Sequence, residues 1–325
     1  MSQAYTSQSV SRMAARERIG FSIEGKNPAD SAARIHEAED AGVRQVWMTA
    51  GGAGGADTLT TYAAVALQTS RIRLGTSIVP IYPRHPLVMA AQALAVDDLA
   101  PGRLRLGIGT SHRPNMEGNF GLTMKTPISY LREYVSVLRS TLWEGTVDYH
   151  GKSLNVKSTL PRRAQVPILV AALGEKAFWT AGEISDGAIS WMCPVPYLLE
   201  KCIPALRAGA ETLHRPAPPV VAHVQVAIST DRPKVAEAAR QRVDRYGRQP
   251  FYANMFKGAG MPVSAEGKGS DALAEALMIS GDEAAVKKRL SDLLAAGLDE
   301  LLITLVPIGD EESERKQLLH LIGSL

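Results

Sequence analysis

Short apolar runs alternate along this chain with longer segments in which apolar residues recur every three or four positions. Eight of the short runs are typical of strands, and most are apolar on both faces, as expected of parallel strands buried between helices. These runs are residues 18–24, 43–49, 71–79, 103–110, 166–172, 187–192, 220–229 and 300–307.

The longer segments predict helices, and at least one follows each strand. Asn27 and Pro28 are typical of a helix start, and Pro101 and Gly102 are typical of a helix end. The predicted helices are residues 28–41, 57–69, 86–99, 129–143, 175–184, 197–213, 233–246, 283–296 and 311–322.

This alternation, with no break in composition, predicts a single (β/α)8 TIM barrel. The competing arrangement is an open, doubly wound sheet, but its Gly-x-Gly-x-x-Gly fingerprint and later acidic residue are missing. The nearest match, at Gly107 and Gly109, lacks the third glycine. We therefore expect one barrel domain over residues 17–325, preceded by a loose, Ser-rich tail at residues 1–16.

Two segments do not fit a minimal barrel. Residues 144–165 precede the fifth strand and predict a hairpin around Gly151. Residues 249–271 precede a helix at 272–278 and are polar and glycine-rich. This second insertion is either a lid over one face of the barrel or a mobile surface loop.

Composition narrows the class of protein. The 325 residues are 45% hydrophobic and 21% charged, and the scattered net charge of +3 gives no reason to expect nucleic acid as a partner. No apolar run is long enough to span a membrane, and the first residues lack the apolar core of a secretory signal. Cys193 and Cys202 show neither metal-ligand nor disulfide-framework spacing. We expect a cytoplasmic protein, without a metal, that acts on a small molecule.

Functional groups in such barrels lie at the carboxyl ends of the strands. The first strand ends at Glu24, whose carboxylate either contacts substrate or pairs with a neighbouring cation. The fourth ends at His112, which is either a satisfied structural histidine or a functional one. It is the best-placed titratable side chain, because imidazole serves as acid, base or hydrogen-bond donor near neutral pH. Glu24 and His112 are therefore the candidate catalytic residues.

Other strand ends carry small or flat residues. Gly51 and Gly52 follow the second strand and either allow close approach of a ligand or form a flexible connector. Residues 171–174 open onto a helix N-terminus, and they either bind an anion such as phosphate through backbone N–H groups or are small for packing alone. Trp191, after the sixth strand, either walls a planar ligand or packs beneath a loop. Because no catalytic triad is recognisable, we expect a cofactor to supply the chemistry.

Three stretches resemble the bacterial luciferase-like superfamily, specifically its oxidoreductases that use the deazaflavin coenzyme F420. They are LGTSIVP at 74–80, APGRLRLGIGTSH at 100–112 and VAALGEKAFWTAGEISDGAISWM at 170–192. The resemblance runs from residue 18 to residue 307 and implies a (β/α)8 barrel with the cofactor at its carboxyl face, commonly in a homodimer. It also implies a cis peptide bond between Ser77 and Ile78, against the deazaflavin ring.

The resemblance implies roles for particular residues. Ser77 and Ile78 would shape the ring, residues 109–111 would lie along its edge, and residues 171–174 would hold its phospholactyl group. The full set of implied cofactor contacts is Thr49, Ser77, Ile78, Gly109, Thr110, Ser111, Ala171, Ala172, Leu173 and Gly174. The implied substrate-lining residues are Gly51, Gly52 and Trp191.

The chain departs from the branch of this group that oxidises sugar phosphates. Ala50 and Gly51 replace an Asp-His pair of that branch, and His112 replaces its catalytic glutamate. We therefore expect a reductase-type enzyme that moves a hydride between the deazaflavin C5 and a small organic substrate. Two alternatives stay open: an FMN-dependent monooxygenase using reduced flavin and dioxygen, and a cofactor-binding barrel without catalysis.

Overall fold

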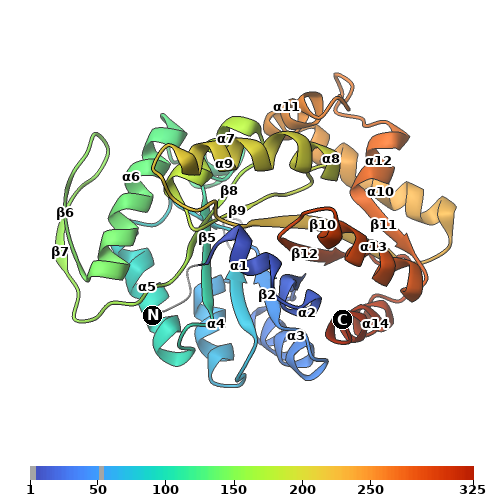
Figure 1. The fold of residues 1–325 in the computed structure, drawn as a ribbon, viewed down its shortest axis with the longest axis horizontal. Coiled ribbons are helices and arrows are strands. Elements are labelled where there is room, and N and C mark those ends of the chain that lie inside the picture. Colours follow the sequence, from blue (N-terminus) through green and yellow to red (C-terminus); the bar gives the residue numbers. More distant parts are fainter. Residues whose placement is uncertain (1–4, 51–54) are drawn as a thin grey trace.

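The computed structural model describes residues 5–50 and 55–325, and a closed ring of eight parallel strands lies at its centre (Figure 1). In ring order the strands are β1 (Ile19–Ser22), β2 (Gln45–Met48), β3 (Arg73–Thr76), β5 (Leu104–Gly109), β8 (Ile168–Ala171), β9 (Gly187–Ile189), β10 (Val220–Ile228) and β12 (Glu300–Leu305). Parallel pairing of β1 with β12 closes the ring. Each strand falls within one of the eight predicted runs, so the (β/α)8 prediction is confirmed.

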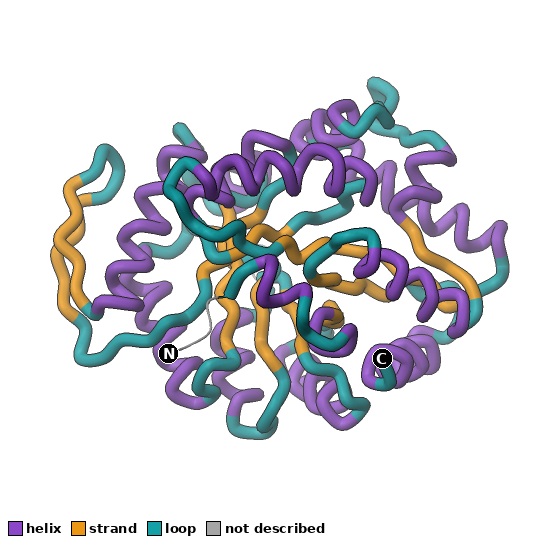
Figure 2. Tube along the Cα trace, in the orientation of Figure 1, coloured by secondary structure: helices purple, strands orange, loops and turns teal. Residues whose placement is uncertain are grey.

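Helices surround the strands (Figure 2). The principal ones are α3 (Pro28–Asp40), α4 (Thr58–Ala66), α5 (Pro86–Leu99), α6 (Pro127–Arg139), α7 (Glu175–Ile184), α9 (Ile203–Glu211), α10 (Arg232–Gly247), α13 (Glu283–Ala295) and α14 (Glu311–Gly323). Shorter segments are the strand β4 (Val79–Pro80) and the helix α8 (Val195–Tyr197). Three π-helical turns are also present: η1 (Pro114–Asn119), η2 (Ser140–Glu144) and η3 (Leu198–Cys202). The Asn27 side chain caps α3 by accepting a hydrogen bond from the Asp30 amide, as the sequence predicted. Within the described residues, no helix is both long enough and apolar enough to cross a bilayer.

The inside of the ring is filled by side chains. One buried cluster comes from five different strands and consists of Trp47, Leu169, Ile189, Val221 and Leu302. Gly75 makes room for the Trp47 indole, because a Cβ there would lie 2.3 Å from the ring. Ile78 and Trp191 pack on this cluster. Since both follow the carboxyl ends of strands, they form the floor of the mouth of the barrel.

A buried polar network closes the opposite, amino-terminal end of the ring. The Arg105 guanidinium donates to both carboxylate oxygens of Glu300, at 2.7 and 2.8 Å, and Gln45 bonds to both residues. The Tyr5 ring covers the guanidinium at 4.7 Å, and its hydroxyl donates to Glu300. This network therefore ties the start of the described chain to the barrel.

The described part of the segment predicted as a loose tail, residues 5–16, contains helix and contacts the barrel. This segment forms α1 (Ser7–Ser11) and leads into α2 (Ala15–Arg18). Ser7 donates a hydrogen bond of 2.6 Å to Asp299, and Val10 is buried. These few anchoring contacts were not predicted, because the segment is polar in composition.

The two insertions differ. The hairpin predicted around Gly151 is present as β6 (Thr146–His150) and β7 (Asn155–Thr159), and it projects beside α6 (Figure 1). The segment predicted as a polar loop at 249–271 instead begins with the helix α11 (Pro250–Gly258), and it leads into α12 (Asp271–Leu277) and the unpredicted strand β11 (Met278–Gly281). Tyr252 and Phe256 are buried on α11 at helical spacing, and the polar residues around them masked this pattern.

Candidate functional site

The ends of β3, β5 and β8 meet at one side of the mouth. The peptide bond between Ser77 and Ile78 is cis, at the position that the resemblance implied. Gly109 lies between the two neighbouring strand ends: a Cβ there would lie 3.1 Å from Ile78 Cδ1 and 3.0 Å from Ala171 Cβ. The structure therefore brings Ser77, Ile78, Gly109 and Ala171 together around a cradle that a larger side chain at Gly109 would begin to fill.

Three polar atoms around the mouth lack a hydrogen-bond partner among the described residues. They are the buried Oγ atoms of Ser22 and Ser77 and the Nδ1 atom of His112, at the ends of β1, β3 and β5. Ser22 and Ser77 are only 5% and 6% exposed. Folded proteins pair nearly all their buried polar groups, and the exceptions commonly face a ligand or water. The mouth therefore has the unpartnered polar groups expected of a site for a polar ligand.

His112 lies against α11. It follows Ser111, whose φ of 58° lies in the left-handed region, and its imidazole is 5.4 Å from the Tyr252 ring and 6.2 Å from the Phe251 ring. Burial lowers the pKa of His112 below the ordinary histidine value of 6.5, so the imidazole is neutral at pH 7. The second insertion thus supplies a wall of the mouth next to the candidate catalytic histidine.

The residues beside His112 also lie along the mouth. Thr110 is half-buried, and the Ser111 hydroxyl accepts a hydrogen bond of 3.2 Å from the Asn115 side chain. At the end of β2, Thr49 is exposed and precedes Ala50, whose amide donates to the Ile78 carbonyl at 3.3 Å. Thr49 therefore lies next to the cradle.

The turn from β8 into α7 contains residues 171–174. Gly174 occupies the N-cap of α7 and supplies no capping side chain, which leaves the first turn of the helix free to face an anion. Leu173 is partly buried against the core. The Ala172 amide already donates to the Ile189 carbonyl at 2.9 Å, so this N–H group is not available to a ligand as expected.

Trp191 lies at the end of β9 and stacks on His223 of β10, with ring centroids 3.8 Å apart. Its Nε1 atom donates a 2.8 Å hydrogen bond to the Tyr246 hydroxyl. One face of the indole is thus already covered. The predicted residues Gly51 and Gly52 lie outside the described residues.

His223, which was not predicted from the sequence, is buried beneath the mouth. Its Nδ1 atom accepts a 3.2 Å hydrogen bond from the Met192 amide, and its Nε2 atom lies 3.0 Å from Thr304 Oγ1. Burial, together with the nearby charge of Arg242, lowers its pKa to about 3. The available signal was the alternation of His223 and Gln225 with apolar residues in an otherwise apolar strand.

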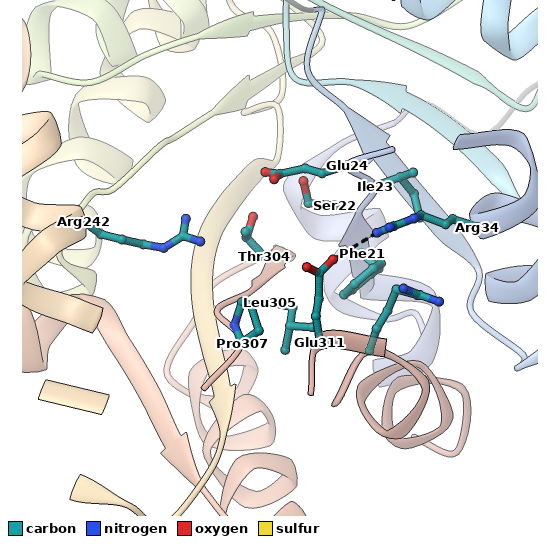
Figure 3. Close-up of a pocket in the computed structure, with 11 residues that line it drawn as sticks. Phe21, Ser22, Ile23, Glu24, Arg34, Arg242, Thr304, Leu305, Pro307 and Glu311 are labelled. Atoms are coloured by element: carbon teal, nitrogen blue, oxygen red, sulfur yellow. Dashed lines mark hydrogen bonds and ion pairs between the residues drawn. The ribbon is translucent and has the colours of Figure 1, made fainter. Parts of the chain in front are cut away.

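A pocket of about 200 Å³, open to solvent, lies at the ends of β1 and β12 (Figure 3). Its lining combines apolar side chains with five charged ones and consists of Phe21, Ser22, Ile23, Glu24, Arg34, Arg242, Thr304, Leu305, Pro307, Glu311 and Arg315. Glu24 therefore faces a pocket, as a substrate contact should. It lies apart from His112, because β2 and β3 separate β1 from β5 in the ring.

Comparison with known proteins identifies two relatives and a solved structure that are similar to this chain. A 5,10-methylenetetrahydromethanopterin reductase of Methanopyrus kandleri is 26% identical over 93% of this chain and 96% of its own length. An uncharacterized protein of Mycobacterium tuberculosis is 31% identical over 59% of this chain, and the matched stretch spans 62% of that relative. A solved F420-dependent secondary alcohol dehydrogenase, bound to an F420-acetone adduct, superposes with a TM-score of 0.79 over 94% of this chain and 98% of its own, at 18% identity.

The last of these likenesses establishes the fold alone. The decisive match is the family model described as luciferase-like monooxygenase, which covers residues 7–319. It includes all eight barrel strands and every described residue of the mouth named above. The chain therefore belongs to the luciferase-like monooxygenase family.

Proposed function

We propose that this protein is an F420-dependent oxidoreductase of the reductase type, which moves a hydride between the deazaflavin C5 and a small organic acceptor. The observation that carries the proposal is the pair of unpartnered buried polar atoms, Ser77 Oγ and His112 Nδ1, beside the cradle at Gly109. The methanopterin reductase of Methanopyrus kandleri, similar along nearly its whole length, supports the deazaflavin as the occupant, because its solved structure is described as coenzyme F420 dependent.

The residues present fit this cofactor. Ile78, Gly109 and Ala171 would support the ring in the cradle, and the Ser77 hydroxyl would bond to its polar edge. The first turn of α7, beyond Gly174, would hold the phosphate. When bound, the deazaflavin supplies two-electron hydride chemistry.

His112 and Glu24 would act on the acceptor. The neutral imidazole of His112 would donate a hydrogen bond to the acceptor atom on which negative charge develops. Tyr252 and Phe251 of α11 would keep water away from that bond. Glu24, across the mouth, would orient the acceptor from the pocket side.

This role predicts a pH profile. The active form of His112 is neutral, and burial lowers its pKa. We expect kcat/KM to stay constant from pH 8 down through the ordinary histidine value of 6.5, and to fall only at more acidic pH, where imidazolium forms. If kcat/KM instead rose as the pH fell through a midpoint above 6.5, the active form of His112 would be the imidazolium acting as a proton donor. That result would contradict this role.

The proposed function is tested by anaerobic assays with reduced F420 and a panel of ketones, enones and imines. Loss of the reduced cofactor, dependent on both enzyme and acceptor, is the expected result. The family description favours FMN-dependent monooxygenation as a second candidate. Oxygen uptake with reduced FMN, together with no turnover of reduced F420, would replace the proposal with that candidate.

A further inference from the structure

The pocket at the ends of β1 and β12 contains two opposite charges that are not paired. Glu24 and Arg242 form no ion pair or hydrogen bond with any described residue. In Figure 3 the Arg242 guanidinium extends from α10 toward the side of the pocket that holds Thr304 and Glu24. The other charged residues of the pocket, Arg34, Glu311 and Arg315, all form ion pairs.

The other two arginines of the pocket are neutralised by their own partners. Arg34 forms ion pairs with Asp30 at 3.2 Å and with Glu311 at 3.3 Å. Arg315 pairs with Glu37 at 3.1 Å. Arg242 is therefore the one pocket cation, among the described residues, that is free to bind an anionic group of a ligand.

The Thr304 hydroxyl adds a directed donor to the pocket that Arg242 lines. Because the Met192 amide donates to Nδ1 of His223, the proton of this neutral imidazole lies on Nε2. Nε2 then donates to Thr304 Oγ1 at 3.0 Å, so the threonine oxygen accepts and its own hydrogen is left to point elsewhere. No described residue takes that hydrogen, and Thr304 lines the pocket. Thr304 and Arg242 together present donors for two oxygens.

The rest of the lining limits the ligand. Phe21, Ile23, Leu305 and Pro307 form apolar walls that suit a hydrocarbon body. The Glu24 carboxylate would repel a second negative charge, which favours a monoanion over a phosphate dianion. The pocket thus combines one free cation, one directed hydroxyl donor and apolar walls.

We propose that this pocket is the acceptor subsite and that it selects acceptors bearing one carboxylate, held by Arg242 and Thr304. This inference rests on the proposed function, because it places the acceptor opposite the cofactor cradle. In ring order, β2 and β3 on one side, and β9 and β10 on the other, separate β1 and β12 from β5 and β8. The carboxylate would thus anchor the acceptor across the mouth from the cradle, with its body extending toward His112.

The test measures binding of benzoate, benzamide and phenyl phosphate to the purified protein by calorimetry, with and without F420. We expect benzoate to bind about tenfold or more tighter than benzamide, the usual effect of a charge-assisted hydrogen bond. Arg242→Gln should abolish this preference, and Thr304→Val should weaken benzoate binding severalfold. The control Arg245→Gln removes the same charge from an exposed position of α10 and should change nothing.

Two results would overturn the inference. One is equal affinity for benzoate and benzamide, or a preference that survives in Arg242→Gln. The other is tighter, Arg242-dependent binding of phenyl phosphate, which would make the subsite one for phosphate esters. If F420-linked turnover occurs only with neutral acceptors, the carboxylate inference fails and the proposed function stands. If benzoate selectivity depends on Arg242 but no acceptor is reduced, the proposed function fails and the subsite stands.

Discussion

Replacing Glu300 with alanine is expected to lower the free energy of unfolding by about 3–5 kcal/mol, because it leaves the Arg105 guanidinium buried without its counter-ion. Arg105 and Glu300 are 4% and 1% exposed, and their bidentate pairing closes the amino-terminal end of the barrel. The same substitution removes the acceptor of the Tyr5 hydroxyl, so the first described segment should also detach. Chemical denaturation monitored by circular dichroism measures the loss.

Two further variants isolate the buried charge as the cause. Replacing both partners with apolar residues, as Arg105→Met and Glu300→Leu together, should recover most of the stability, because no unpaired charge remains. Asp292→Ala breaks the exposed pair with Lys288 and should cost no more than about 1 kcal/mol. A loss below that value for Glu300→Ala would show that water reaches Arg105 and that this end of the barrel is open.

His112→Phe is expected to lower kcat by about 100-fold or more, the usual range for loss of a positioned acid–base or hydrogen-bonding group. Phenylalanine keeps the ring contacts with Tyr252 and Phe251, so the wall formed by α11 should be preserved. The fold should also tolerate the change, because Nδ1 of His112 has no partner within the described structure. Cofactor affinity should change less than twofold, since the cradle lies at Ile78 and Gly109.

A matched variant controls for loss of any histidine. His150 is exposed on the hairpin, where Asp148 is its one ion-pair partner among the described residues, and His150→Gln should retain wild-type turnover. Steady-state rates with reduced F420, and equilibrium titration of the cofactor, separate the catalytic effect from the binding effect. Wild-type turnover by His112→Phe would remove His112 from the chemistry and leave the cofactor cradle as the main determinant of rate.

The barrel itself was predictable because its signals are local. Strands buried on both faces produce unbroken apolar runs such as residues 103–110, and Asn27 and Gly174 begin helices by chemistry within a few residues. The docking of residues 5–16 was not predictable, because it depends on contacts with Asp299 and Glu300 at the far end of the chain. The helix α11 was not predicted for a different reason: its buried face is short and is surrounded by glycine and polar residues.

In the candidate site, too, local features were predictable from the sequence and contacts between distant residues were not. Strand ends identify Ser77, Gly109 and His112, because a parallel barrel places every strand end at one mouth. The partners of a side chain depend on neighbouring strands and helices. The hydrogen bond between His223 and Thr304, and the position of Arg242 in the pocket lining, could therefore not be predicted from the sequence. The relative placement of the two candidate catalytic residues, Glu24 and His112, also needed the ring order, which puts them on different parts of the mouth.

The central claim is that the cradle at Ile78, Gly109 and Ala171 binds the deazaflavin. Titration of F420 into the protein, followed by its fluorescence and compared with FMN, tests this claim most directly. We expect saturable one-to-one binding of F420 that is tighter than that of FMN, and about tenfold or greater weakening in Gly109→Val, because the added methyl groups press on Ile78 and Ala171. Gly118→Val, where a Cβ meets nothing within 4 Å, should bind normally. Absence of saturable F420 binding, or tighter binding of FMN, would contradict the account.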